Sequence, residues 1–324
     1  MSIEIKKYQQ DVNFPSTQQM ESSDEIDLRE LFAVIWQGKW VIIAITAIFA
    51  IGSVIFALSQ PNIYKSEALL APADAEQGGG GLAALAGQFG GLASMAGINL
   101  GGGGGVDKTQ MAIEVMKSRQ FTSEFIQRHD LLADLMAAKS WDMANDKVIY
   151  DVDDYLVDTK KWIREVNPPF KPQPSMQEAY KEFSKLVSIN KDKETGMVKL
   201  AVEHVSPTLA QQWVTWLVED INKVMKQRDV LEAMRSTEFL NKQISLTNIA
   251  DIRSMLYKLV EEQAKTIMFA EVRDEYIFKT IDPALVQEEK AKPKRALIVV
   301  LGTMLGGMLG VFFVLIRHFV RKED

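Results

Sequence analysis

The sequence predicts an α+β fold in which two transmembrane helices flank an exported α/β base domain with a long protruding helix. Three observations lead to this prediction. Uncharged apolar runs occupy residues 40–59 and 296–316 of the 324-residue chain. The residues between them, 60–295, show the period of strands in some places and the period of amphipathic helices in others. Between Pro207 and Pro283 the chain has no Gly or Pro, which is typical of long helices.

Both apolar runs are long enough to cross a bilayer. About 20 helical residues span the roughly 30 Å of hydrocarbon, and neither run contains Pro or a charged residue. The long polar stretch before the first run argues against a cleaved signal peptide. With both spans retained, the two termini lie on the same side. Lys39 and Arg29 favour the cytoplasm for the N-terminal side, so we expect residues 1–39 and 317–324 inside and residues 60–295 outside.

The second span has glycines at a regular spacing. Gly302, Gly306 and Gly310 are four residues apart, so they stack along one helix face that another helix can approach closely. Two interpretations remain open at this point. The face packs against the first span of the same chain, or it contacts a neighbouring subunit or another membrane protein.

The first part of the exported segment predicts a strand followed by a loop. Residues 62–71 alternate in the manner of a strand, with Tyr64, Ser66, Ala68 and Leu70 on one face. Residues 78–105 then contain more than half of the chain's 20 glycines and no charge. We expect a loop with an apolar middle here. Such a loop either has no role of its own or becomes ordered against a membrane or a partner.

Two motifs in this segment resemble ligand sites but do not fit them. The glycines before Lys108 suggest a phosphate-binding loop, yet Asp107 lies where such a loop needs Gly. The carboxylates of Asp151, Asp153 and Asp154 are more typical of a solvated turn than of a metal site. We therefore expect neither a cofactor nor a bound metal.

The second part of the exported segment predicts a hairpin, a long helix and a returning strand. Residues 186–204 form the hairpin, closed by Gly196, and Ser206 caps a helix that begins at Pro207. The helix extends over about 207–275, with a weak patch at 245–248 where it could bend. Strand character returns at 276–281. The apolar stripe that includes Trp213 and Leu217 would cover the apolar face of the hairpin. We also expect the helix to contact other subunits through Trp213, Leu217, Ile249, Ile252, Leu256 and Leu259. Of these, the last four form a seam that either closes an intramolecular helical hairpin or bundles subunits.

The residue types of catalysis are scarce. The chain has no Cys and only three His, which excludes thiolate chemistry and Cys-based metal sites. His129 and His204 lack the spacing to Ser or Asp of a triad, and both are predicted to be surface or interface residues. A net charge of −6 argues against nucleic acid as a partner. The sequence therefore predicts a protein that is not an enzyme.

Several segments resemble one family over nearly the whole chain. The most specific is the approach to the second span, where Pro283 is followed by Pro293, Lys294 and Arg295 and then by the spaced glycines. The remaining segments are an acidic stretch at residues 27–31, the strand that begins at Tyr64, and the junction at residues 202–207 that leads to Trp213. Together they resemble the Wzz family of polysaccharide co-polymerases, which regulate O-antigen chain length in lipopolysaccharide biosynthesis. Family members often have a further proline between Pro283 and Pro293, which this sequence lacks.

The resemblance implies a protein of the bacterial inner membrane with its bulk in the periplasm and its termini in the cytoplasm. It also implies a homo-oligomeric ring of about eight protomers, closed by heterologous interfaces, and partnership with the Wzy polymerase. A polysaccharide chain and the lipid bilayer are further partners under this interpretation. The glycines of the second span would then serve membrane helix packing or polymerase contact.

Two other functions stay open from the sequence. One is an exopolysaccharide or capsule chain-length and export protein of the tyrosine-kinase-linked type. For that type we expect a separately encoded kinase, because only residues 317–324 follow the second span. The other is an envelope adaptor whose helical arm docks a partner of the outer membrane.

Overall fold

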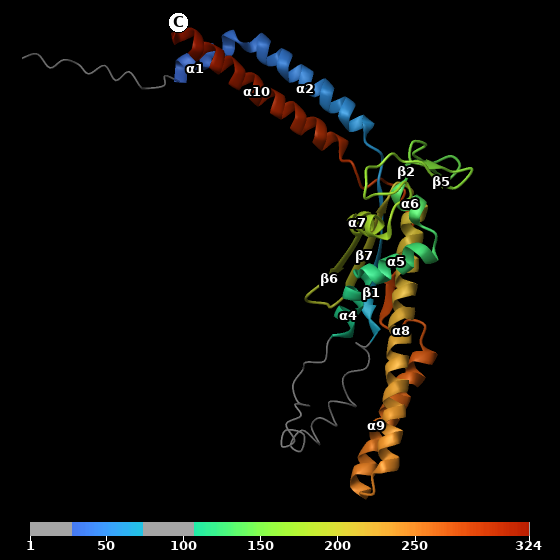
Figure 1. The fold of residues 1–324 in the computed structure, drawn as a ribbon. Helices are drawn as coiled ribbons and strands as arrows, with labels where there is room; N and C mark the ends of the chain where they lie inside the picture. The colour runs from blue at the N-terminus through green and yellow to red at the C-terminus, as the bar shows by residue number, and fades with distance from the viewer. Residues whose placement is uncertain (1–27, 74–106, 324) are drawn as a thin grey trace, which may run out of the picture. The chain divides into compact units, whose positions relative to one another are not determined.

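The computed structural model describes residues 28–73 and 107–323, and it divides the chain into two units. One unit combines residues 1–57 with residues 296–324, and the other comprises residues 58–295. The predicted glycine-rich loop at 78–105 and most of the predicted tail at 1–39 lie outside the described residues. Figure 1 shows the helices and strands of both units.

The first unit is helical. It consists of α1 (Leu28–Gln37), α2 (Lys39–Ser59) and α10 (Arg295–Glu323). Helices α2 and α10 lie side by side (Figure 1), and both are long and apolar enough to cross a membrane. Helix α1 was not expected within the N-terminal tail. Phe32 and Trp36 lie one turn apart in it, with their ring centroids 6.1 Å apart, and this pair contributes to the stability of the short helix.

The second unit is built on a four-stranded antiparallel sheet. Its strand order is β6-β7-β1-β8. The strands are β1 (Tyr64–Pro72), β6 (Val187–Lys191), β7 (Val198–His204) and β8 (Phe278–Asp282). The predicted hairpin is confirmed as β6 and β7, and Gly196 in its turn has a φ of +71°, which a side chain would oppose.

The two faces of the sheet differ as the alternation predicts. Tyr64, Ser66, Ala68 and Leu70 of β1 are buried on one face. On the other face Glu67 forms an ion pair with Lys199 of the neighbouring strand at 3.3 Å, and both side chains are partly exposed to solvent. The sheet therefore covers the core on one side only, which is common for antiparallel sheets.

Helices cover the apolar face. They are α4 (Lys108–Met116), α5 (Arg119–Arg128), α6 (Leu132–Met136), α7 (Met176–Leu186) and the first half of α8 (Pro207–Leu246). Side chains cap four of their N-termini, and in α5 the cap is Ser118, which accepts a hydrogen bond from the backbone N–H of Phe121. Asp107 accepts a hydrogen bond from the backbone N–H of Thr109 in α4, and Ser175 forms a capping box with Glu178 in α7. Ser206 caps α8 as predicted, with Pro207 in the first turn.

Two small hairpins lie outside the main sheet. The first pairs β2 (Ala138–Asp142) with β3 (Lys147–Tyr150), and the second pairs β4 (Tyr155–Leu156) with β5 (Lys161–Trp162). The carboxylates predicted as a solvated turn lie just before β4. There Asp151 accepts a hydrogen bond from Lys139 at 2.9 Å, and this bond lowers the pKa of its carboxyl group.

The long helix predicted over about 207–275 is two helices. Helix α8 ends at Leu246, and α9 (Ala250–Val272) packs back along it (Figure 1). Between them Thr247 and Ile249 have extended backbone angles, and Arg253 donates to the carbonyl of Thr247 at 2.7 Å. The break falls beside the weak patch at 245–248, where polar residues compete for backbone hydrogen bonds. Helices α8 and α9 therefore form an intramolecular hairpin, but the seam residues Ile249, Ile252 and Leu259 stay exposed on it, so the bundling of subunits through this seam remains open.

One buried amide joins α8 to the returning strand. The Asn222 side chain accepts hydrogen bonds from the backbone N–H groups of Ile277 and Phe278 at 2.8 and 2.9 Å. It also donates to the carbonyl of Phe278 at 3.0 Å. A single side chain thus satisfies three backbone groups where β8 begins, so helix α8 positions this strand.

His204 is buried, and its prediction as a surface or interface residue is wrong. The ring lies at the end of β7, and its Nδ1 accepts a hydrogen bond from the backbone N–H of Ser206 at 3.0 Å. Because that N–H can only donate, the ring proton sits on Nε2, which donates to the carbonyl of Asp134 at 3.0 Å. Protonation would break the bond to Ser206, and burial lowers the pKa of His204. Its spacing to other residues gave no sign of this burial.

We predict that acidification destabilises the fold through His204. Its pKa is lowered in the folded state from an ordinary value of 6.5. Below about pH 6.5 the unfolded chain therefore binds a proton that the folded chain excludes. The free energy of unfolding should fall by up to about 1.4 kcal/mol per pH unit in this window, and it should be insensitive to this group above it. Thermal unfolding of the full chain in detergent between about pH 5 and pH 8 measures the effect.

The matched variant is His204→Asn, whose carbonyl oxygen can still accept from Ser206. It should be less stable at neutral pH but should lose this part of the pH dependence. Carboxyl groups with lowered pKa, such as those of Glu178 and Asp192, titrate only at lower pH. An identical pH slope in the wild type and the variant would contradict the assignment.

Candidate functional site

The glycines of the second span face the first span. A Cβ atom added to Gly302 would lie 2.5 Å from Cβ of Ser53, and one added to Gly306 would lie 2.5 Å from Cβ of Phe49. At Gly310 the nearest atom would be Cα of Ile42 at 3.2 Å. Side chains at the first two positions would overlap α2, so the structure favours packing of the two helices of one chain against each other.

The same type of contact occurs where α1 joins α2. A Cβ atom on Gly38 would lie 2.4 Å from a methyl carbon of Val314 in α10. Lys39 lies over the ring of Trp36, 4.7 Å from its centroid. The helical unit therefore has close backbone approaches at both its glycine face and its N-terminal turn. Sequence spacing revealed the first of these and missed the second, because Gly38 is a single residue without a repeat.

The approach to the second span is tied to the first strand. Arg295 donates to the side-chain oxygen of Asn62 at 3.1 Å, and Ile63 pairs with Lys292 in a β-bridge. Lys292 also binds Glu203 at 2.6 Å. The α+β unit thus holds its first and last segments together. Of the other residues predicted for this approach, Pro283 and Lys294 are exposed and Pro293 is half-buried.

Further hydrogen bonds fix the segment after β8. The Ser66 hydroxyl donates to the carbonyl of Leu285 at 2.7 Å, and Gln211 donates to the carbonyl of Ala284 at 3.3 Å. Ala284 itself is buried. These contacts come from a strand and from the helix α8, so this proline-containing segment is anchored on two sides although it has no regular secondary structure.

The arm formed by the second half of α8 and by α9 has a surface of exposed apolar side chains. Ile249 is 59 % exposed, Ile252 42 % and Leu259 42 %, and Leu256 is half-buried. Further large apolar side chains exposed on the same two helices are Leu231, Met234, Phe239, Met255, Met268 and Val272. So much apolar surface on an element that is not membrane-spanning indicates an interaction surface.

Two residues predicted for this interaction surface do not belong to it. Trp213 is 0 % exposed and Leu217 is 1 % exposed, because the first half of α8 lies across the sheet. Their side chains fill the core of the protomer and cannot reach another subunit. The apolar spacing was read correctly as a packing face, but the sequence does not tell which face is covered by the chain itself.

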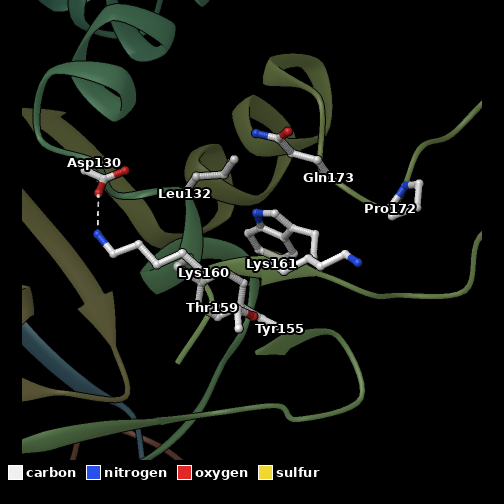
Figure 2. Close-up of a pocket in the computed structure, with 10 residues that line it drawn as sticks. Asp130, Leu132, Tyr155, Thr159, Lys160, Lys161, Pro172 and Gln173 are labelled. Atoms are coloured by element: carbon white, nitrogen blue, oxygen red, sulfur yellow. Dashed lines mark ion pairs between the residues drawn. The ribbon is translucent and has the colours of Figure 1, made fainter. Parts of the chain in front are cut away.

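A cavity of about 620 Å³ lies beside the second small hairpin. Its lining combines residues from the β4–β5 hairpin, the turn after α5, the start of α6 and the segment before α7 (Figure 2). Trp162 is half-buried and contacts the buried Tyr155, with ring centroids 4.8 Å apart. Lys160 and Lys161 add two ammonium groups to the rim. No periodic pattern in the sequence indicates this site, although the adjacent lysines before a tryptophan are a usable signal.

Further contacts behind Tyr155 hold the aromatic side of this cavity in place. Tyr155 contacts Tyr150 with ring centroids 5.7 Å apart, and the Tyr150 hydroxyl donates to the carboxylate of Asp134. Burial raises the pKa of the Tyr150 phenol, and the bond to Asp134 raises it further. The phenol therefore stays a neutral donor, which fixes its ring and, through it, the position of Tyr155.

A charged cluster joins α5 to α8. Asp220 accepts from Arg128 at 2.7 Å and lies 3.0 Å from Nε2 of His129, whose ring stacks on Trp216 at 4.3 Å. His129 is half-buried in this contact between helices and was predicted to be a surface or interface residue. The cluster has a base and a carboxylate. Among the described residues, no hydrogen bond joins it to the side chain of a Ser, Thr or Cys, so we interpret it as an ion pair between two packed helices.

The geometry is that of a protein with two candidate membrane helices and a mixed α and β unit. A mixed α and β unit has a helical arm with an apolar surface, and the chain has two helices that by length and composition can cross a bilayer. The predicted α+β fold class is confirmed. Among the residues that the structure describes, no group of three or more His, Asp or Glu side chains is arranged to hold a metal ion.

Comparisons with known proteins identify the family. Residues 24–129 match the family model of the chain length determinant protein, Wzz, and residues 246–319 match that of the G-rich domain on putative tyrosine kinase. The first match confirms the resemblance to the Wzz family. The chain is thereby placed among the polysaccharide chain length co-polymerases.

Solved structures of that class are also similar to this chain. One is a full-length bacterial polysaccharide co-polymerase, with 14% identity over 92% of this chain and 99% of the other, and a TM-score of 0.38. Another is a fragment of WzzB, a polysaccharide co-polymerase from Salmonella Typhimurium, with 11% identity over 71% and 100% of the two chains and a TM-score of 0.26. No curated protein sequence matches.

We predict that the glycine face is sterically specific. Gly306→Ala places a Cβ atom 2.5 Å from Cβ of Phe49, so the helices must separate. Gly307→Ala is the matched control, because its Cβ would meet only the Thr46 hydroxyl at 3.8 Å. The first substitution should cost about 1–3 kcal/mol of stability in detergent and the second close to none. Unfolding of the two variants side by side measures this, and equal midpoints would contradict the packing.

Proposed function

We propose that the protein is a non-enzymatic regulator of lipopolysaccharide O-antigen chain length that acts together with the Wzy polymerase. The observation that carries the proposal is the match of residues 24–129 to the chain length determinant family. That region contains the first span, strand β1 and helices α4 and α5. It thus includes both the membrane anchor and part of the core of the α+β unit.

The architecture supports this proposal in physical terms. A length regulator must stay beside a membrane-bound polymerase, and two spans provide such an anchor. We place the α+β unit in the periplasm of a bacterium with the termini in the cytoplasm, following the Lys/Arg bias of the first span. The lipid-exposed sides of α2 and α10 are then the surfaces available to Wzy, since the glycine face is covered by α2.

Self-association is the second part of the proposal. The exposed apolar side chains of α9 lie on an arm that extends from the α+β unit (Figure 1). Burying them against a second copy removes apolar surface from water, at about 25 cal/mol per Å². Copies related by rotation would close into a homo-oligomeric ring, for which we retain a size of about eight protomers.

A second candidate function is favoured by one observation. The match of residues 246–319 to the G-rich domain on putative tyrosine kinase covers α9, β8 and most of α10. It supports an exopolysaccharide or capsule chain-length protein of the tyrosine-kinase-linked type. Both functions use the same anchored scaffold, and they differ in the polymer that is controlled.

A deletion strain separates the two functions. If the protein regulates O-antigen, its loss should replace the preferred chain length on a lipopolysaccharide gel by a broad distribution, with polymer still made. If it serves exopolysaccharide, the ladder should stay unchanged while secreted polymer changes in amount or size. The gel and the size distribution of secreted polymer are measured on the same cultures. Unchanged profiles in both would overturn the proposal of length control.

We predict that charge on the arm prevents assembly. Ile252→Asp combined with Leu259→Asp puts two carboxylates on the exposed apolar surface of α9. Because burial of an unpaired charge is costly, association should weaken by roughly tenfold or more. Light scattering in mild detergent measures the particle mass.

The control is Ser254→Asp, which adds charge at an exposed polar position of the same helix. It should leave the particle mass unchanged. A wild-type monomer at all concentrations, or a double variant that assembles like the wild type, would exclude the arm as the interface.

A further inference from the structure

The cavity beside the β4–β5 hairpin has the composition of a carbohydrate site. It holds about 620 Å³, within the range of ligand pockets, which is roughly 300–1,000 Å³. Small-molecule pockets combine an apolar surface with a few polar groups that fix orientation. Here Trp162 supplies the aromatic surface, and Thr159 and Gln173 supply a hydroxyl and an amide.

The aromatic surface is held rigid, which a binding platform requires. Trp162 is in β5, paired with Tyr155 of β4, and the two rings are inclined by 50°. Tyr155 is buried and rests on Tyr150, whose hydroxyl is bound to Asp134. The electron-rich face of an aromatic ring attracts the weakly positive C–H groups on one side of a pyranose. A rigid ring makes that contact without further loss of side-chain entropy.

The charges of the rim favour an anionic ligand. Lys160 reaches toward Asp130, with 3.8 Å between the ammonium and carboxylate groups, while Lys161 extends in the other direction (Figure 2). Lys160 has a positive φ of 50°. Asp130 offsets one of the two ammonium charges. The rim therefore has a net positive charge, and Lys161 is the group placed to bind a carboxylate.

We propose that this cavity binds a sugar residue of an acidic polysaccharide. The pyranose ring lies on Trp162, its hydroxyl groups reach Thr159 and Gln173, and its carboxylate pairs with Lys161. The inference rests on the proposed function, because a length regulator must stay near its polymer. It goes further by assigning a site on the protomer and a chemical class of sugar, where the family alone assigns neither.

The test is calorimetric titration of the full-length protein in detergent with two trisaccharides of the same linkage, one of galacturonic acid and one of neutral galactose. The acidic trisaccharide should bind about tenfold more tightly. Trp162→Ala should weaken both by about tenfold, while Trp162→Phe, which keeps a ring, should retain most of the affinity. Lys161→Gln should abolish the preference for acid and leave the neutral affinity unchanged.

Lys181→Gln is the matched control, since Lys181 is an exposed lysine of α7 that does not line the cavity. It should bind as the wild type does. Binding that Trp162→Ala does not change, or no binding at about millimolar sugar, would overturn the site, and equal affinity for the two sugars would overturn its acidic preference. The ladder of the deletion strain reports on length control independently, so failure of the site and failure of the proposed function are distinguishable.

Discussion

The fold depends on the burial of the first half of α8 against the apolar face of the sheet. Trp213, Leu217 and Ile221 of this helix fill the space above β1 and β7. Removing these side chains from water supplies the main favourable free energy for joining helix and sheet, at about 1.5–3 kcal/mol for each large side chain. The buried end of β7 leads through His204 and the Ser206 cap directly into this helix. The position of α8 therefore determines where everything after it can go.

The arm follows from this constraint. Beyond the sheet, α8 has no apolar surface of its own unit to cover it, so α9 packs back along it and the pair buries Ala233, Ile244 and Ala270. Asn222 then receives the returning chain and starts β8 beside β1. The apolar side chains on the outside of the pair remain exposed. A chain that makes such an arm gains no intramolecular stability from those residues, and the proposed association of copies would give them a physical role.

The anchor and the α+β unit are specified by different interactions. Close backbone approach at Gly302 and Gly306 joins the two membrane helices, where packing replaces the hydrophobic effect as the source of association. In the α+β unit, the bridge of Ile63 to Lys292 and the bond of Arg295 to Asn62 keep its two ends together. The proposed carbohydrate cavity lies in neither of these contacts. Its lining comes from the β4–β5 hairpin and from neighbouring segments outside the main sheet.

The sequence by itself determined the features that depend on local pattern. Charge-free runs of sufficient length gave the spans, alternation gave β1 and the β6–β7 hairpin, and Ser206 before Pro207 gave the start of α8. These can be read because each follows from the period of one element or from a cap. Only the tertiary structure decided that α9 turns back, that His204 and Trp213 are buried within the protomer, and that the β4–β5 hairpin meets α6 and the segment before α7 at a cavity. Those outcomes depend on which surface covers which, and segments distant in sequence compete for the same apolar face without leaving a periodic signal.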